Sequence, residues 1–218
     1  MKKVELAILA ACFIGLSYEA KAVDVEVGFG ETRFIRQHDG VWCQDAFPCW
    51  LDLSDKSLSL GVSEQIGTYR YRAEFKMLGN LFSNGLAVSD GTYNPYFVAT
   101  CGSDCDLLNY TTRSNEAGVV LSAMRPFNVA SLPMYIEAGV FAHVTKLQVT
   151  LTQPHNGRFI AEAKREHSVT YGPVIGIGYR HGGLDLGLRY YYLDSSAEND
   201  PITPLAAGAW EFGLRAYF

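Results

Sequence analysis

The last nine residues of the chain alternate between apolar side chains and polar or small ones. Every second side chain from Trp210 to Phe218 is apolar, whereas Glu211 and Arg215 fall on the opposite face of an extended strand. A strand with aromatic rings on one face and ionic groups on the other needs two different solvents. Lipid outside and a polar lumen inside provide them, so this stretch predicts one strand of a transmembrane β-barrel.

Seven further stretches of the sequence show the same period of two. An even number of strands is what a single-chain bacterial barrel needs. The sequence therefore predicts an all-β fold, an eight-stranded antiparallel up-and-down transmembrane β-barrel that the last strand closes by pairing with the first. Pro173 cannot donate to a ladder, so we expect it near the start of its strand. The predicted strands are 23–30, 58–63, 69–77, 116–123, 135–144, 171–180, 184–192 and 210–218.

The connections between these strands alternate between long and short. Long extracellular loops and short periplasmic turns are the usual asymmetry of membrane barrels, so we expect the long connections outside the cell. The long connections are 35–56, 79–112, 147–167 and 194–207, and the short ones are 64–68, 126–133 and 181–183.

The polar face of the predicted strands decides between two kinds of barrel. Alternation alone also fits a soluble barrel that keeps its apolar face inward. The polar face is rich in glycine, which only the narrow interior of an eight-stranded barrel needs, so it favours the membrane barrel. Its ionic groups are nearly balanced in sign, which predicts an ion-paired network that plugs the lumen. The predicted network comprises Asp24, Glu26, Arg70, Arg72, Glu74, Lys76, Glu116, Glu137, Arg180, Asp185, Arg189, Glu211 and Arg215.

Aromatic side chains also occur on the apolar face. Rings with a polar tip favour the interface between lipid and water, so we expect them to form the girdles of the barrel. They are Tyr69, Tyr71, Tyr179, Tyr190, Tyr192 and Trp210.

The amino-terminal part of the chain has the order of a secretory signal peptide. Two lysines follow the initiator methionine, residues 6–16 are apolar, and an Ala-Lys-Ala cleavage site stands at 20–22. We predict that residues 1–22 are a cleaved signal peptide and that residues 23–218 form the barrel domain. A lipoprotein cleavage box ending at Cys12 is the alternative, but too few apolar residues precede it.

Four cysteines follow the predicted cleavage site. An even number in an exported chain predicts two disulfides. Spacing favours Cys43 with Cys49 and Cys101 with Cys105, although four cysteines allow three pairings. No histidine stands at a ligand spacing from the second pair, so we predict no metal site and no cofactor.

The strands, the four long connections and the terminal phenylalanine resemble the small eight-stranded bacterial outer-membrane barrels of the OmpA and OmpX family, including its Ail and Lom type. The resemblance implies a Gram-negative outer membrane, extracellular loops, and contact with outer-membrane lipid and lipopolysaccharide. It also implies that Phe218 is an assembly signal for the barrel-assembly machinery. The formal net charge of −5 argues against nucleic acid as a partner.

Barrels of this kind host several activities, so the loops have to indicate the function. We predict a structural or surface-interaction role, in which the loops contact host, phage or lipopolysaccharide. Exposed aromatic rings in stiffened loops lower the entropic cost of binding. The alternative is that these rings pack against their own loop or rest on lipid headgroups. The candidate contact residues are Trp42, Phe47, Trp50, Tyr93, Tyr96 and Phe97.

Two other functions stay open, a lipid A-modifying enzyme and a narrow pore for small solutes. His167 and Ser168, with two glutamates close by, come nearest to a Ser-His-acid set. Adjacent residues of a strand point to opposite faces, so we predict no catalytic residues and no enzymatic activity. Side chains fill the lumen of most eight-stranded barrels, which disfavours a pore.

A basic segment is a further candidate contact. Lys164 and Arg165, with Arg158 nearby, can bind the phosphates of lipopolysaccharide through charge-assisted hydrogen bonds. Ordinary solvated loop charge explains the same residues, and both interpretations stay open.

Overall fold

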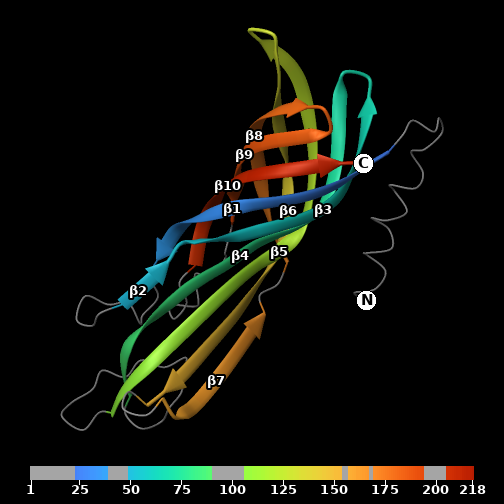
Figure 1. The fold of residues 1–218 in the computed structure, drawn as a ribbon. Helices are drawn as coiled ribbons and strands as arrows, with labels where there is room; N and C mark the ends of the chain where they lie inside the picture. Colours follow the sequence, from blue (N-terminus) through green and yellow to red (C-terminus); the bar gives the residue numbers. More distant parts are fainter. Residues whose placement is uncertain (1–22, 39–48, 90–105, 154–156, 167–168, 194–204) are drawn as a thin grey trace, which may run out of the picture.

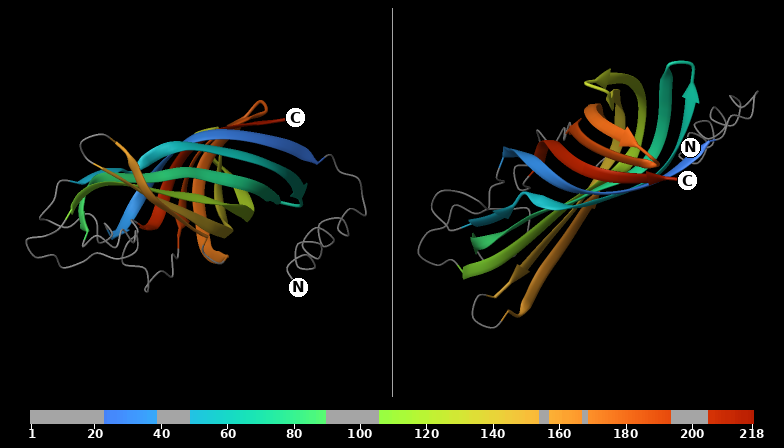
Figure 2. Two further views of the ribbon diagram at one scale, coloured as in Figure 1. Left: turned by 90° about the horizontal axis from the view of Figure 1, so that it is seen from below. Right: turned by 45° about the horizontal axis from the view of Figure 1, so that its top comes forward.

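The structure is a computed structural model and describes residues 23–38, 49–89, 106–153, 157–166, 169–193 and 205–218. Its regular secondary structure within these ranges consists of β-strands. The long strands curl around a common interior, as Figures 1 and 2 show from three directions.

Eight long strands form the barrel and two short strands flank it. The neighbours pair antiparallel in the order β1-β3-β4-β5-β6-β8-β9-β10, and β10 pairs with β1. The ring is therefore closed, and the predicted eight-stranded antiparallel barrel is confirmed. The barrel strands are β1 (Asp24–His38), β3 (Ser54–Ile66), β4 (Tyr69–Ser89), β5 (Asp106–Val129), β6 (Leu132–Thr152), β8 (Thr170–His181), β9 (Leu184–Tyr192) and β10 (Leu205–Tyr217), and the short strands are β2 (Cys49–Asp52) and β7 (Phe159–Glu166).

The closing seam joins the first strand to the last. Gly30 of β1 lies opposite Gly213 of β10, and Glu26 lies opposite Tyr217. Val25 and Phe218 exchange backbone hydrogen bonds of 3.1 and 3.0 Å. The carboxyl-terminal strand closes the barrel as its alternation predicts, because a closed ring gives each of its faces a different solvent.

Three tight turns mark one end of the barrel, which we call the turn end. Their centres are residues 67–68, 130–131 and 182–183, within the predicted short connections. Ala130 and Ser131 have φ of 47° and 71°, and Gly182 and Gly183 have φ of 57° and 83°. Positive φ at both central residues is the signature of a type I′ hairpin turn.

The turn at Ala130 and Ser131 lacks the residues that this backbone favours. A left-handed backbone costs about 1–2 kcal/mol for an ordinary L-residue, whereas Asn-Gly fits it. We expect Ala130→Asn with Ser131→Gly to raise the free energy of unfolding by about 1 kcal/mol, measured by urea titration of the heat-sensitive gel mobility. Gly182→Ala is the matched control and should lower stability. If both variants unfold like the original chain, these turns carry no strain.

Three strands continue past the ring at the end opposite the turns. Beyond Met77, β4 pairs with β2 instead of β3, and beyond His143, β6 pairs with β7 instead of β8. The result is a five-stranded extension sheet that projects from the barrel (Figure 1). It consists of residues 49–52, 80–89, 106–115, 146–152 and 159–166.

The predicted length of the long connections is wrong. Much of 79–112 and 147–167 is strand and belongs to the extension sheet. The reason is that the alternation reverses there: Leu147 and Val149 are buried, and the intervening side chains face outward. The criterion of an apolar outward face, which identifies the barrel strands, therefore excludes these residues. The other long connections, 35–56 and 194–207, likewise contain the end of β1, all of β2, and the starts of β3 and β10.

A β-bulge at Gly79 lies where β4 leaves the ring. The register shifts between Met77 and Gly79, and Gly79 has a φ of 95°. Asp55 of β3 accepts hydrogen bonds from the backbone N–H of Asn80 at 2.6 Å and from its side-chain amide at 2.8 Å. The carboxylate thus satisfies a donor that has lost its ladder partner and holds the bend of β4 in place.

The barrel interior has a charged layer near the turn end and an apolar layer near the extension sheet. Side chains of the charged layer are described in the next section. The apolar layer fills the interior beyond it and comprises Phe34, Leu78, Leu81, Val120, Phe141, Val174, Tyr191, Leu193, Ala206 and Ala209.

Candidate functional site

The outward face of the barrel is apolar around its circumference. Phe29, Phe75 and Phe212 are 55, 52 and 57 % exposed. An exposed apolar surface of this extent is foreign to soluble monomers and is what lipid requires. Each of the eight strands contributes to it, for example with Val27, Leu60, Phe75, Val119, Val140, Ile177, Leu188 and Leu214.

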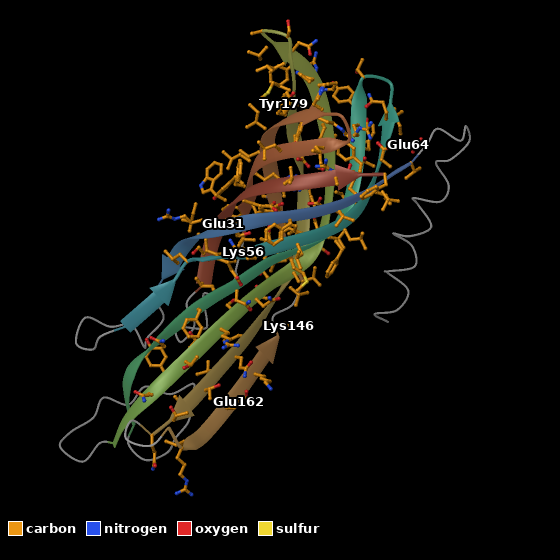
Figure 3. All side chains as sticks on the ribbon, viewed as in Figure 1. Glu31, Lys56, Glu64, Lys146, Glu162 and Tyr179 are labelled. Carbon is orange, nitrogen blue, oxygen red and sulfur yellow. The ribbon has the colours of Figure 1, made fainter. Side chains whose placement is uncertain are left out.

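Aromatic rings stand at both edges of this apolar belt. Tyr69 and Tyr71 are exposed beside the turn at 67–68, and Tyr179 is half-buried near the same end (Figure 3). Toward the opposite end, the rings of Tyr190 and Trp210 pack with their centroids 4.9 Å apart. The structure thus places rings at two heights, which are the positions that interfacial girdles occupy.

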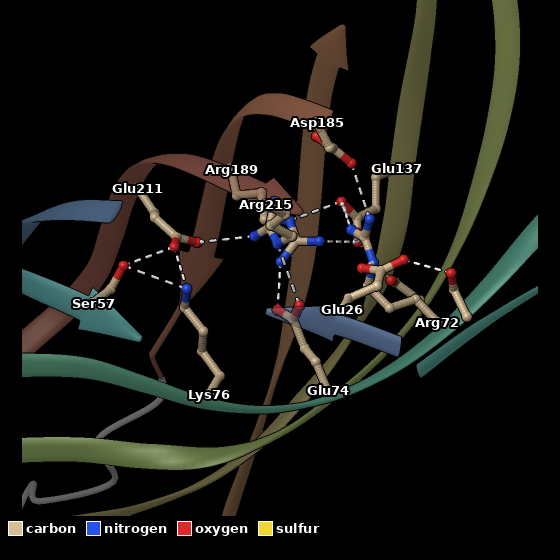
Figure 4. Close-up of polar contacts among 12 residues, drawn as sticks. Glu26, Ser57, Arg72, Glu74, Lys76, Glu137, Asp185, Arg189, Glu211 and Arg215 are labelled. Atoms are coloured by element: carbon tan, nitrogen blue, oxygen red, sulfur yellow. Dashed lines mark hydrogen bonds and ion pairs between the residues drawn. The ribbon is translucent and has the colours of Figure 1, made fainter. Parts of the chain in front are cut away.

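Arg72 of β4 forms the first group of buried ion pairs inside the barrel (Figure 4). Its Nε lies 2.6 Å from Oε2 of Glu26 on β1, and its Nη2 lies 3.0 Å from Oδ2 of Asp185 on β9. Glu137 of β6 lies 3.4 Å from Nη1. One guanidinium therefore connects four strands, which its fork of donors makes possible.

Arg189 of β9 forms the second group. Its Nε and Nη2 each lie 2.8 Å from an oxygen of Glu137, so this pair is bidentate. Its Nη1 contacts Glu74 of β4 and also lies 3.3 Å from the hydroxyl of Tyr191. Bidentate, charge-assisted bonds of this kind are the strongest that side chains make.

Glu211 of β10 is the centre of the third group. It pairs with Lys76 of β4 and accepts hydrogen bonds of 2.7 Å from the hydroxyls of Ser57 and Tyr191. Arg215 lies 3.5 Å from Glu211 and 3.4 Å from Glu74, and so links this group to that of Arg189. The three groups form one buried network.

The buried network contains more carboxylates than cations. Five carboxylates (Glu26, Glu74, Glu137, Asp185 and Glu211) lie among four cations (Arg72, Lys76, Arg189 and Arg215). Hydroxyl groups supply the remaining donors: Ser63 bonds to Glu26, Ser122 bonds to Glu137 at 2.5 Å, and Tyr135 bonds to Asp185 at 2.5 Å. Such donors lower the cost of holding extra carboxylates away from water.

Three of the predicted network residues lie at the turn end, where they are partly exposed. Arg70 pairs with Asp24, and Nη2 of Arg180 lies 3.6 Å from the same carboxylate. The guanidinium of Arg180 also stacks over the ring of Tyr217 at 3.6 Å. These contacts close the turn end of the charged interior.

Glu116, the remaining predicted network residue, lies apart from the four cations. Nδ1 of His143 is 2.9 Å from its carboxylate, and the hydroxyl of Thr145 donates to it at 2.8 Å. On the other side of the ring, Nε2 of His143 is 2.9 Å from the hydroxyl of Thr170. The ring itself stacks on Phe141 with centroids 4.9 Å apart.

Three residues of the interior site lie on the inward face that the alternation predicts but are not among the predicted network residues. Tyr135, His143 and Tyr191 are buried and bind ionic partners. A signal for them exists, because each lies an even number of residues from a predicted lumen residue on its own strand, such as Glu137 or Arg189. Period two places them on the inward face as surely as the ionic residues.

The polarity of the strands reverses at the edge of the apolar belt. Along the outward face of β6, Val140 and Val144 are followed by Lys146, while the inward face changes from Glu137 to buried Leu147. On the turn-end side of this level the barrel has its apolar face outside, and on the other side the extension sheet has its apolar face inside. A bilayer that ends at this level satisfies both arrangements.

The disulfide and loop-contact candidates are mostly outside the described residues. Among the cysteines, Cys49 begins β2, while Cys43, Cys101 and Cys105 lie outside. Both disulfides therefore stay predictions. The same holds for the signal peptide 1–22. Of the loop aromatics, Trp50 lies in β2, whereas Trp42, Phe47, Tyr93, Tyr96 and Phe97 are outside the described ranges.

No group of His, Cys, Asp and Glu side chains suited to a metal ion occurs among the described residues. In the same part of the chain, no helix has the length and apolar character needed to cross a membrane.

No protein-family model and no curated protein matches the chain. Among solved structures, the chain is similar to Neisserial surface protein A at 15% identity and a TM-score of 0.39, over 91% of this chain and 98% of that one. It is also similar to the translocator domain of the autotransporter NalP from Neisseria meningitidis, at 13% identity and a TM-score of 0.26, over 100% of this chain and 96% of that one. Both TM-scores are below 0.5, so the assignment of the fold does not use these likenesses. It follows from the strand pairing given above.

Proposed function

We propose that the protein is an outer-membrane barrel of Gram-negative bacteria with a closed lumen and a structural or surface-interaction role. The buried network of Arg72, Arg189 and Arg215 carries this proposal, because each of these residues is 1 % exposed and binds carboxylates of other strands. Opening a water-filled path would require these pairs to break. Losing one partner of a buried pair costs about 3–5 kcal/mol, which favours a plugged lumen over a pore.

The proposed orientation puts the turn end in the periplasm and the extension sheet outside the cell. Segment 39–48 joins β1 to β2, and segment 90–105 joins β4 to β5, so both start or end on the extension sheet. The aromatic candidates in these segments would then contact host, phage or lipopolysaccharide. Long connections outside and tight turns inside support this orientation.

Single-channel recording in planar bilayers tests the closed lumen. We expect the purified full chain to show no steady openings, while its heat-dependent gel mobility and its resistance to protease in vesicles show that it has inserted. Steady openings of uniform size from the inserted protein would establish the pore instead.

Labelling of intact cells tests the orientation in the same protein. A peptide tag after Gly157 lies on the extension side, and a tag between Gly182 and Gly183 lies at the turn end. Antibody should label intact cells only for the first tag, and both tags after lysis.

One observation favours a second candidate, a lipid-modifying hydrolase. Thr170, His143 and Glu116 follow the order of hydroxyl, imidazole and carboxylate that acyl-transfer enzymes use. Against it, His143 is 1 % exposed, so its ring is not accessible to a lipid substrate. A buried polar row that fills the lumen explains the same contacts.

Mass spectrometry of lipid A separates the two functions. We expect cells that carry Thr170→Val or His143→Gln to have the same lipid A as cells with the original chain, because these groups serve only the interior. Deletion of the whole chain should also leave lipid A unchanged. Loss of one acyl modification in the Thr170→Val strain, with normal barrel levels in the membrane, would show a catalytic role for the threonine.

A further inference from the structure

The outward face of the extension sheet carries cations at the edge of the apolar belt. The strand registers place Asn80 of β4, Asn115 of β5 and Lys146 of β6 in one row across the sheet. The next row away from the belt holds Arg113 of β5 and Lys164 of β7 on either side of Gln148. Side chains directly opposite each other in neighbouring strands are about 5 Å apart, so the two rows form one surface.

This surface is hollowed. A depression of about 490 Å³ is lined by three cations, three amides and one leucine, namely Arg113, Lys146, Lys164, Asn80, Asn115, Gln148 and Leu147. We call it the cationic hollow. Figure 3 shows Lys146 on the extension sheet, with Glu162 of β7 farther along it.

The cations of the hollow differ from those of the interior in their partners. Arg113 lies over the ring of Phe82 at 5.7 Å, and Lys164 lies 3.3 Å from Glu162. Within the described part of the chain, neither Arg113 nor Lys146 has a carboxylate at ion-pair distance. Two further carboxylates border the hollow: Asp55 accepts a hydrogen bond of 2.8 Å from the amide of Asn80, and the register puts Glu166 opposite Lys146.

The depth of the hollow matches that of lipid headgroups. The last apolar row before it is Met77, Ala117 and Val144. Asn115 and Lys146 each lie two residues beyond this row, a rise of about 7 Å along the strand. The headgroup layer on each side of a bilayer is roughly 5–8 Å thick, so these donors lie at its level.

We propose that the cationic hollow binds the phosphate groups of lipopolysaccharide in the surrounding outer leaflet. The proposal rests on the proposed outer-membrane orientation, which places the extension sheet outside the cell. The guanidinium fork of Arg113 and the ammonium group of Lys146 are exposed hydrogen-bond donors, and phosphate oxygens are the acceptors that suit them. The acyl chains of the same lipid would lie along the apolar row below. Ordinary solvated charge would show no preference for phosphate.

Titration with labelled lipopolysaccharide tests the proposal on the detergent-solubilised full chain. Arg113→Gln with Lys146→Gln should weaken binding about tenfold or more, because two charge-assisted contacts are lost. The matched control is Arg33→Gln with Lys56→Gln, which removes two exposed cations from the outward side of β1 and β3. The control should bind like the original chain, and all variants should keep the heat-dependent gel mobility.

Two further ligands test whether phosphate is the group that the hollow binds. Phosphatase-treated lipopolysaccharide should bind the original chain as weakly as the intact lipid binds the double variant. Inorganic phosphate alone should compete only at millimolar concentration, because it lacks the acyl chains.

Three results would overturn the proposal: equal loss in the control, undiminished binding of the phosphate-free lipid, or inorganic phosphate binding as tightly as the lipid. None of these results bears on the conductance or the cell labelling. The proposed barrel function is therefore tested independently of lipopolysaccharide binding.

Discussion

Replacing Arg189 with methionine is expected to lower the free energy of unfolding by about 3–5 kcal/mol. Methionine fills a similar volume but leaves Glu74 and Glu137 buried without their principal cation. The cost is the desolvation of carboxylates that have lost their partner. Urea titration of the barrel in vesicles, followed by tryptophan fluorescence and by gel mobility, measures it.

An exposed pair provides the control for Arg189. Lys56 and Glu31 lie 3.4 Å apart, with side chains that are 63 and 65 % exposed. Lys56→Met should therefore change stability by less than about 1 kcal/mol. A second variant, Arg189→Met with Glu74→Gln, should recover part of the loss, because it removes one of the two carboxylates that lost their cation. If Arg189→Met and Lys56→Met are equally mild, the interior is more hydrated than its burial indicates.

Gly118→Ala is expected to have the next largest effect, a loss of about 3 kcal/mol at the upper end of the range for overpacking. A Cβ at Gly118 of β5 would meet the backbone of Ala142 and His143 on β6. Backbone atoms in a paired strand cannot rotate away as a side chain can, so the two strands would have to separate. Urea titration in vesicles measures the loss.

Gly213→Ala is the matched control for Gly118. A Cβ at Gly213 would first meet Oε1 of Glu211, at 3.2 Å, which is the end of a flexible side chain. We therefore expect a change below about 1 kcal/mol for this variant. An equal loss in both variants would mean that any added methyl group in the strands is harmful, and that the close approach at Gly118 is not special.

The membrane strands were predictable because two solvents impose a strict period. Residues 184–192 were expected as a strand, and β9 has those same bounds. Pro173 was expected near a strand start, and β8 begins at Thr170. In these strands the type of side chain indicates which side it faces, since lipid accepts only apolar groups and the narrow lumen accepts only small or paired ones.

The extension sheet was missed because its strands obey the opposite rule. Buried Leu151 and outward Gln148 follow a soluble pattern on the same strand that carries Val140 toward lipid. The period stays at two, but the apolar phase changes from the outward to the inward face. If the apolar face is assumed to stay outward along the whole strand, the predicted strand stops where the apolar belt ends, which is too early.

The lumen-facing residues were predictable as a set, but their pairing was not. Arg72 and Asp185 are separated by 113 residues and still bond at 3.0 Å. Which side chains share a level depends on the stagger of strands around the ring, and period-two alternation contains no information on stagger. Glu116 illustrates the limit, because the stagger places it beside His143 rather than beside a permanent cation.

The partners of Arg72 constrain how the chain enters the bilayer. Glu26, Glu137 and Asp185 come from β1, β6 and β9, and none of them belongs to a hairpin with β4. A hairpin that crossed alone would carry the guanidinium into hydrocarbon without these three partners, which is costly. We therefore expect these strands to be gathered around the guanidinium before it crosses the hydrocarbon, so that the charge is neutralised when the barrel enters the bilayer.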